Sequence, residues 1–188
     1  MKLLVGLGNP GEEYRATRHN VGYRVAEAFR RRHGGGREER RARSLVSRCD
    51  LGEGEILVAR PLTYMNRSGE AVAALLDLAQ AGPADLMVVC DDLNLELGTL
   101  RLRARGTHGG HNGLRSIIET LGSQAFPRLR VGVGPAEAEV PHAEFVLAPF
   151  RRSERARVEE VVEAAADCVE RAVRDGIAKA MSRYNAPA

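Results

Sequence analysis

The sequence predicts an α/β fold: a single domain with a mixed, mainly parallel twisted sheet flanked by helices. Two observations favour this class. Short apolar runs, typical of buried strands, alternate along the chain with amphipathic segments of helical periodicity. Polar and glycine-rich motifs directly follow these strands, where an open α/β sheet places its ligand-binding residues. With 188 residues the chain can bury a core without disulfides or metals, so we expect one domain over residues 1–188.

The N-terminal quarter is expected to form a buried strand followed by a helix. Residues 1–7 are leucine-rich and bounded by glycine, as in a buried strand. In residues 21–32, apolar side chains recur at helical spacing, and the glycines at 34–36 end this helix. Residues 37–43 are rich in charge, and we interpret them as a flexible, solvated loop.

The remaining elements follow from the same reading of periodicity. A helix is expected at 68–80, with Ser68 as its N-cap. The almost wholly apolar run 86–90 is interpreted as a central strand that ends at Asp91, with the neighbouring Asp92 facing solvent. The strand at 99–104 is interpreted as a hairpin partner of that central strand, which argues against an all-parallel sheet. The other expected elements are a hairpin at 44–51 and 56–60, a strand at 129–133, and helices at 112–121, 153–174 and 177–184.

Composition places the chain among soluble globular proteins of the cytoplasm. The hydrophobic content is 44% and the charged content 28%, and no apolar stretch is long enough to cross a bilayer. The first residues run straight into a motif, so we expect no cleavable signal. The three cysteines lack CxxC spacing and are interpreted as free thiols in a reducing compartment. The net charge of +3 is carried mostly by arginine, which suits phosphate binding, but charge alone favours a compositional bias.

Polar side chains cluster at the ends of the predicted strands. His19 is the natural general base, because histidine titrates near neutral pH, and Asp91 is the natural carboxylate to orient it. Asn9, Asn66 and Asn112 carry amides that can donate to a developing oxyanion. Neither motif contains an obvious serine or cysteine nucleophile, which favours attack by activated water. These residue types indicate an ester or amide hydrolase that uses no metal.

Other chemistries are less well supported by the residues. Gly6 and Gly8 could belong to a phosphate-binding loop, but the chain has no GxGxxG or GxxxxGK[ST] motif. His108 and His111 are three residues apart with no cysteine nearby, which is a weak zinc signal. Asp92 could help to hold magnesium, but a solvent-facing position is the simpler interpretation. We therefore expect no metal and no cofactor.

Three long motifs occur in order along the chain. They are GLGNPGEEYRATRHNVG at residues 6–22, TYMNRSGEAV at 63–72, and DDLNLELGTLRLRARGTHGGHNGLRSI at 91–117. In these motifs the sequence resembles the bacterial peptidyl-tRNA hydrolase family, and the resemblance covers essentially the full chain. It implies cleavage of the ester between a peptide and the 3′-ribose of tRNA, which recycles tRNA from aborted translation. It also implies a monomer that needs no cofactor and whose partner is peptidyl-tRNA.

The resemblance also implies roles for individual residues. His19 would be the catalytic base, Asp91 would support it, and Asn9 would sense the peptide end of the substrate. Substrate or tRNA contacts would fall to Tyr14, Tyr64, Asn66 and Asn112.

Two rival functions differ from this one in testable ways. A non-catalytic RNA-binding or splicing adaptor on the same fold would have no reason to keep His19, Asp91 and the three asparagines together. An unrelated small-ester or peptide hydrolase would act on substrates that lack tRNA. The alternation of Arg101 and Arg103 with leucines, followed by Arg105, is compatible with phosphate contacts and equally with an ordinary solvent-facing strand.

Overall fold

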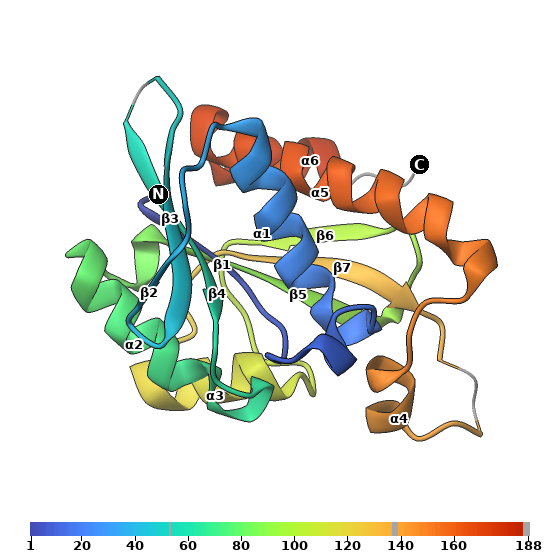
Figure 1. The fold of residues 1–188 in the computed structure, drawn as a ribbon. Coiled ribbons are helices and arrows are strands. Elements are labelled where there is room, and N and C mark those ends of the chain that lie inside the picture. Colours follow the sequence, from blue (N-terminus) through green and yellow to red (C-terminus); the bar gives the residue numbers. More distant parts are fainter. Residues whose placement is uncertain (53, 137–138, 186–188) are drawn as a thin grey trace.

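The computed structural model describes residues 1–52, 54–136 and 139–185, and these form one α/β unit around a twisted sheet (Figure 1). Within the described residues the sheet has seven strands, which in spatial order are β2 (Glu39–Arg41), β3 (Ser44–Asp50), β4 (Glu55–Pro61), β1 (Leu3–Gly6), β5 (Leu86–Glu96), β7 (Arg128–Gly134) and β6 (Leu100–Arg103). Its centre is parallel, because β4, β1, β5 and β7 run in the same direction. Its edges are antiparallel: β3 pairs with β4 and β2 with β3 at one edge, and β6 pairs with β7 at the other. The predicted fold class is confirmed.

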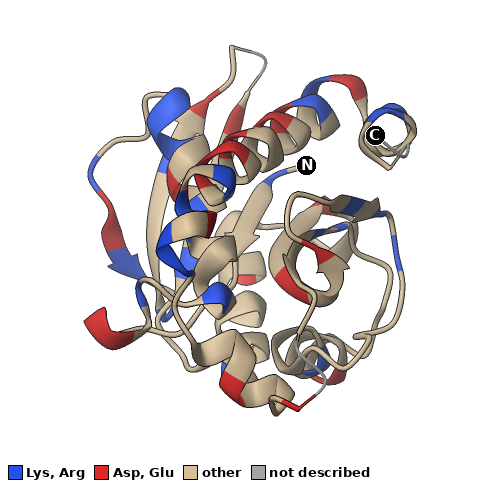
Figure 2. Ribbon diagram, turned by 90° about the vertical axis from the view of Figure 1, so that its right-hand side faces the viewer, with Lys and Arg blue, Asp and Glu red and all other residues tan. Residues whose placement is uncertain are grey.

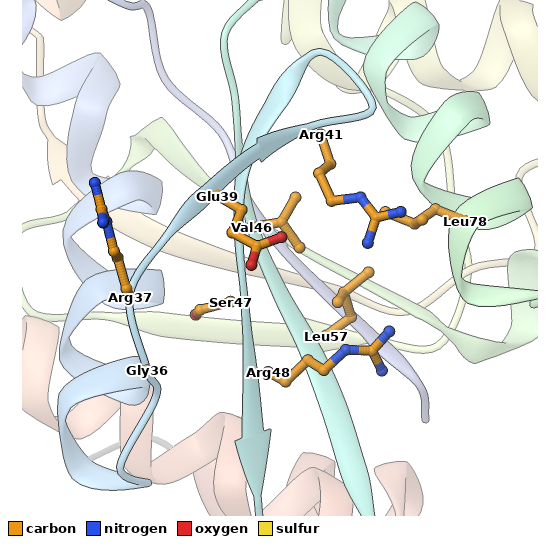
Figure 3. A pocket seen from close by; sticks show the side chains of 9 residues that line it. All are labelled: Gly36, Arg37, Glu39, Arg41, Val46, Ser47, Arg48, Leu57 and Leu78. Carbon is orange, nitrogen blue, oxygen red and sulfur yellow. The ribbon is translucent and has the colours of Figure 1, made fainter.

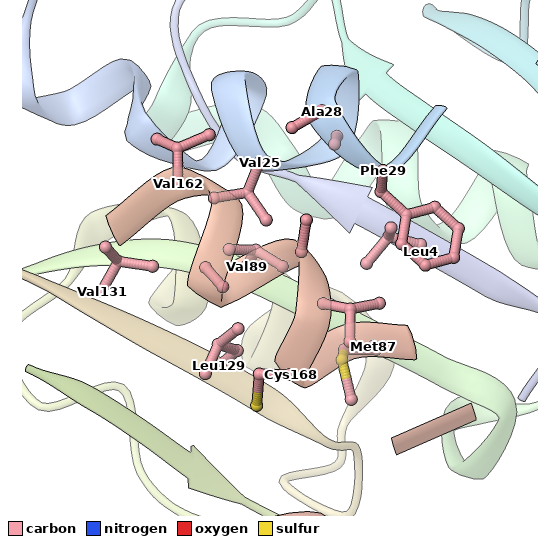
Figure 4. Close-up of a cluster of buried hydrophobic side chains, with 14 of the residues drawn as sticks. Leu4, Val25, Ala28, Phe29, Met87, Val89, Leu129, Val131, Val162 and Cys168 are labelled. Carbon is pink, nitrogen blue, oxygen red and sulfur yellow. The ribbon is translucent and has the colours of Figure 1, made fainter. Parts of the chain in front are cut away.

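Helices cover both faces of the sheet because alternate residues of each strand point to opposite sides. Leu4 and Met87 point to the face covered by α1 (Val21–Arg32), α5 (Arg155–Asp175) and α6 (Ile177–Tyr184), as Figure 4 shows in part. Leu3 and Leu86 point to the face covered by α2 (Ser68–Ala79) and α3 (Asn112–Leu121). The short helix α4 (His142–Leu147) lies apart from both layers (Figure 1). Among the described residues, none of the helices has the length and apolar character needed to cross a membrane.

Two glycines let α1 begin close against the end of β1. A Cβ atom on Gly6 would lie 2.1 Å from the carbonyl oxygen of Gly22, and one on Gly22 would lie 2.5 Å from the carbonyl oxygen of Val89. Any side chain at either position would therefore push the helix away from the sheet. This close approach sets the start of α1, and the residues just before it, against the carboxyl ends of β1 and β5.

The charged segment 37–43 is partly a strand, so the prediction of a flexible loop is wrong there. Residues 39–41 form the edge strand β2, which pairs antiparallel with β3. Charged side chains suit an exposed edge, because they discourage pairing with another chain. The turn is formed by Ala42 and Arg43 at φ 46° and 55°, a left-handed conformation that a short hairpin requires. Neither residue type is typical of that turn, which hid the hairpin in the sequence.

The predicted pairing of the strand at 99–104 with the central strand is also wrong. The central strand does not end at Asp91 but continues to Glu96, and its neighbours are β1 and β7. The strand β6 pairs antiparallel with β7 instead. Smaller differences concern helix starts: Ser68 is the first residue of α2 rather than its cap, and α5 begins at Arg155.

Candidate active site

The predicted base and carboxylate meet at the carboxyl edge of the sheet. His19 lies in a short 3₁₀ helix, η2 (Arg18–Asn20), directly before α1, and Asp91 lies in β5. Nδ1 of His19 is 2.7 Å from Oδ1 of Asp91. Both residues are buried, with exposed fractions of 9% and 2%. A hydrogen bond in such a shielded place is stronger than the same bond at the surface.

The charge state of Asp91 fixes the direction of this hydrogen bond. Burial alone raises the pKa of the Asp91 carboxyl, but the nearby imidazoles of His111 and His19 outweigh burial and hold that pKa well below its ordinary range. Asp91 is therefore a carboxylate, which can only accept hydrogen bonds. It follows that Nδ1 of His19 carries the proton and donates it, and that Nε2 of the neutral ring keeps a lone pair.

His111 is a second partner of the same carboxylate oxygen, and this contact could not be recognised in the sequence. Its Nε2 lies 3.0 Å from Oδ1 of Asp91, and its ring centroid lies 5.2 Å from that of His19. The sequence suggested only a weak pairing of His111 with His108. In the structure His108 does not join the cluster, since its Nδ1 accepts a hydrogen bond from the backbone of Gly110. The spacing of 20 residues between Asp91 and His111 gave no signal of their contact.

Asn9 holds the loop that follows β4. Its Oδ1 accepts a hydrogen bond of 2.8 Å from the backbone nitrogen of Met65, the first residue of the 3₁₀ helix η3 (Met65–Arg67). The side chain of Asn20 bonds both the backbone nitrogen and the backbone oxygen of Asn9, each at 2.9 Å. Among the described residues Nδ2 of Asn9 has no hydrogen-bond partner, so this donor is available to a ligand. Nothing in the sequence indicated that Asn20 holds the backbone of Asn9 in this way.

The remaining predicted contact residues lie on two exposed rims. The rings of Tyr14 and Tyr64 meet edge to face with centroids 6.4 Å apart, and Tyr64 is 56% exposed. Asn66 and Asn112 are exposed at the starts of neighbouring elements, η3 and α3. Met65 is buried where these elements meet, with its sulfur so near Gly113 that a Cβ there would lie 2.6 Å away.

A cleft of about 410 Å³ opens beside the histidine pair. His19, Asp91 and Asn112 line it, whereas Asn9, Tyr14, Tyr64 and Asn66 do not. Among the described residues that line it there is no serine or cysteine. The other lining residues come from β5, from residues 106–111 before α3 (the glycine loop), from β7 and from α4: Asp92, Leu93, Asn94, Gly109, Gly110, His111, Arg130, His142, Ala143 and Val146.

Asp92 does not face solvent, so this prediction is wrong. It is 8% exposed, and its Oδ2 accepts a hydrogen bond of 3.0 Å from Nη1 of Arg130. The other arm of that guanidinium donates to the carbonyl oxygen of His108 at 2.8 Å. The pair therefore ties the glycine loop to the sheet, and the partly buried guanidinium of Arg130 is the partner that the sequence did not reveal.

One cluster of described residues has the composition of a metal site. His19, Asp91 and His111 each offer a ligand atom, and these atoms lie within 4.8 Å of one another. Two imidazoles and one carboxylate suit several transition metals. The same three atoms are, however, joined by direct hydrogen bonds, which an ion would have to replace. The absence of a metal stays a prediction.

A second, smaller cavity of about 190 Å³ lies at the opposite edge of the sheet from β6 (Figure 3). Its lining includes Arg41 and Arg48 around Val46 and Leu57, and it contains none of the predicted site residues. Of the two cavities, the cleft beside His19 is therefore the one that matches the predicted chemistry.

Figure 2 shows acidic and basic residues interspersed along the helices on the side of the molecule that it presents.

The fold and this cleft define a class of protein: an α/β protein with a buried histidine–carboxylate pair beside an open cleft, the arrangement that general-base hydrolases use. The model of the family described as peptidyl-tRNA hydrolase matches residues 3–188. Proteins named peptidyl-tRNA hydrolase from Chloroflexus aggregans and Desulforudis audaxviator are 46% and 47% identical over 186 and 185 residues. These alignments cover 98% of this chain in both cases, and 99% and 93% of the relatives. The chain belongs to the peptidyl-tRNA hydrolase family.

A solved structure supports the same assignment. The crystal structure of peptidyl-tRNA hydrolase from Acinetobacter baumannii superimposes with a TM-score of 0.91 at 32% sequence identity. The superposition covers 99% of this chain and 95% of that one. The likeness therefore extends over the sheet, both helical layers and the cleft-bearing edge.

Proposed function

We propose that this chain hydrolyses the ester bond between the peptide and the tRNA of peptidyl-tRNA, with His19 as the general base. The observation that carries the proposal is the hydrogen-bonded pair of His19 and Asp91 at an open cleft in a member of this family. Cleavage would return tRNA that was sequestered by aborted translation.

The geometry supports a direct attack by water. Nε2 of neutral His19 takes one proton from a water molecule while the water oxygen bonds to the ester carbonyl carbon. The carbonyl oxygen becomes an oxyanion, and the candidate donors to it are the amides of Asn9, Asn66 and Asn112. When the ester C–O bond breaks, the 3′-oxygen of the ribose leaves with the proton from the imidazolium. Asp91 stabilises that imidazolium in between.

Substrate recognition is assigned to the rims around this centre. Asn9 is proposed to contact the peptide end, through the Nδ2 group that has no partner among the described residues. Tyr14 and Tyr64 offer ring surfaces, and Tyr64 is largely exposed. Asn66 and Asn112 are proposed to contact the substrate or the tRNA from the starts of η3 and α3.

The tRNA is proposed to lie against β6 and the loop after it. Arg101, Arg103 and Arg105 are exposed, and within the described residues none of the three has an ion pair. Arginine contacts phosphate in a bidentate manner, so three free guanidinium groups suit an RNA backbone.

The remaining features of the proposal are those of a simple cytoplasmic enzyme. Residues 1–188 act as one domain and as a monomer, and neither a metal nor a cofactor takes part. The non-catalytic adaptor is less favoured, because a protein that only binds RNA has no need of a buried His19–Asp91 pair beside an open cleft.

The test compares release of tRNA from N-acetyl-aminoacyl-tRNA by the native chain and by His19→Asn, in a buffer that contains a chelator. We expect the variant to lose activity by roughly 10²- to 10⁴-fold, the usual contribution of a general base. His108→Asn is the matched control, because it makes the same change on the neighbouring glycine loop and should cleave normally. If the native chain binds tRNA but does not cleave, the adaptor function is correct. If only a metal-supplemented native chain cleaves, the metal-free mechanism is wrong.

A further inference from the structure

His111 connects Asp91 to the start of α3 through both of its ring nitrogens. Its Nδ1 lies 3.1 Å from the backbone nitrogen of Gly113 and 3.2 Å from that of Leu114, so the ring caps the helix. Its Nε2 lies 3.0 Å from Oδ1 of Asp91. The side chain is only 6% exposed, which leaves little access for competing water.

These contacts determine where the proton of the ring resides. Backbone N–H groups can only donate, so Nδ1 of His111 must offer a lone pair to Gly113 and Leu114. The Asp91 carboxylate can only accept, so Nε2 must carry the proton. The contacts of Nδ1 and those of Nε2 therefore require the same neutral tautomer of His111. A second proton on Nδ1 would point at two N–H donors and would have no acceptor, so protonation of this ring is disfavoured.

We propose that His111 is a positioning residue, held neutral by the start of α3, that divides the charge of Asp91 between two imidazoles. Oδ1 of Asp91 accepts from both rings, so the carboxylate attracts a proton on His19 less strongly than it would alone. His111 thereby favours the unprotonated form of His19, in which the ring can act as a base. The effect on rate rests on the proposed role of His19, whereas the tautomer of His111 does not.

The other ionisable groups near the cluster do not replace this effect. Asp92 follows Asp91 in β5, but Arg130 neutralises it at 3.0 Å. Burial raises the pKa of the Cys90 thiol to about 12, so that group is neutral at physiological pH. His142 on α4 lines the same cleft and has to be controlled for in any measurement of pH dependence.

The first experiment measures kcat/KM against pH for His111→Asn. Asparagine is among the best N-cap residues, so this variant keeps the cap of α3 but lacks the N–H that reaches Asp91. We expect the acid limb of the profile to move to higher pH by about one pH unit, the size expected for one charge-assisted hydrogen bond. His108→Asn is the matched control and should leave the limb in place. The shift should persist in a His142→Gln background.

The second experiment records the NMR signals of the histidine ring nitrogens in the native chain. This measurement does not depend on catalytic activity. We expect His111 to keep a bare Nδ1 and a protonated Nε2 from about pH 5 to 8, the range in which histidines normally titrate. A second proton on His111 within this range would overturn the proposal, and so would an acid limb of His111→Asn that coincides with that of His108→Asn. If His111→Asn does not fold, the NMR result decides. A native chain that keeps this tautomer but cleaves nothing would refute the proposed function and leave the assignment of His111 intact.

Discussion

A single oxygen atom, Oδ1 of Asp91, links the two histidines of the site. It accepts a hydrogen bond from His19 at 2.7 Å and another from His111 at 3.0 Å. The pKa of Asp91 is held below its ordinary range, so the carboxylate keeps its charge at every pH at which the chain would be assayed. The expected loss of activity on acidification therefore comes from an imidazole of the cleft, which is His19 in the proposed mechanism, and not from neutralisation of Asp91.

Replacement of Asp91 by asparagine tests this assignment of charge. Asp91→Asn keeps the shape of the side chain but removes the negative charge that stabilises the imidazolium of His19. We expect kcat to fall by roughly 10²- to 10⁴-fold, in line with the loss of the carboxylate in a Ser-His-Asp site. The acid limb of the pH profile should move to lower pH, opposite to the shift expected for His111→Asn. An acid limb that stays in place would show that Asp91 does not act through His19.

Among single residues, the sequence allowed prediction of those whose side-chain chemistry suggests a catalytic role. His19 and Asp91 could be paired because a base and its orienting carboxylate are a recurrent combination. Asn20 and His111 could not be assigned, because their roles depend on hydrogen bonds that exist only once β1, β5 and α3 meet. In the sequence Asn20 lies between His19 and Val21, and His111 follows two glycines, so neither position indicates a partner.

At the scale of elements, Arg18 fastens one wall of the cleft to the segment that carries His19. Its side chain is 5% exposed, and it donates both guanidinium arms to other elements. One arm reaches the carbonyl oxygen of Pro149, and the other reaches both carboxylate oxygens of Glu154. The guanidinium carbon also lies 4.6 Å and 5.0 Å from the ring centroids of Phe145, in α4, and Phe150.

Substitution of Arg18 by lysine should weaken the attachment of α4 to the segment that carries His19. A lysine keeps the charge but has no planar fork, so it cannot serve Pro149 and Glu154 together. We expect Arg18→Lys to lose roughly 1.5–3 kcal/mol of unfolding free energy, the range for hydrogen bonds to charged groups. We also expect faster proteolysis around α4. Chemical denaturation and limited proteolysis would measure both effects.

Arg24→Lys provides the control for this prediction. Arg24 also pairs with a glutamate near the start of α5, Glu159, at 2.6 Å, but that glutamate is 69% exposed. Exposed pairs contribute about 0–1 kcal/mol, so the loss should be much smaller. If both variants lose the same unfolding free energy, the contacts of Arg18 stabilise the protein no more than an exposed ion pair does.

The elements that the sequence mispredicted share one physical cause. Strand β2 is charged throughout and its turn lacks glycine, so local composition favoured a loop, whereas pairing with β3 determines its conformation. Strand β6 was assigned to its neighbour in the sequence, but β7 comes later and inserts between β5 and β6. Periodicity identifies a strand, and only long-range pairing decides its neighbours. The buried strands β1 and β5 could be predicted because both of their faces are apolar.

Over the whole molecule, the distribution of charge distinguishes the proposed RNA surface better than the net charge of +3 does. On the outer helices basic side chains are matched by acids, as in the pairs of Arg171 with Asp175 and Arg174 with Glu170. On β6, Arg101 and Arg103 have no such partners among the described residues. Their positive charge is therefore available to a polyanion, whereas that of the helices is largely neutralised.

This difference predicts how tRNA binding depends on salt. Each phosphate neutralised by a protein cation releases counterions, so the plot of log K against log salt concentration steepens by roughly 0.7–0.9 for each contact. We expect the double variant Arg101→Ala/Arg103→Ala to bind deacylated tRNA more weakly, with a slope shallower by about 1.4–1.8 if each arginine meets one phosphate. The double variant Arg171→Ala/Arg174→Ala removes the same charge from α5 and should leave the slope nearly unchanged. Because the two variants have equal net charge, equal slopes would show that tRNA responds to overall charge and that β6 is not its binding surface.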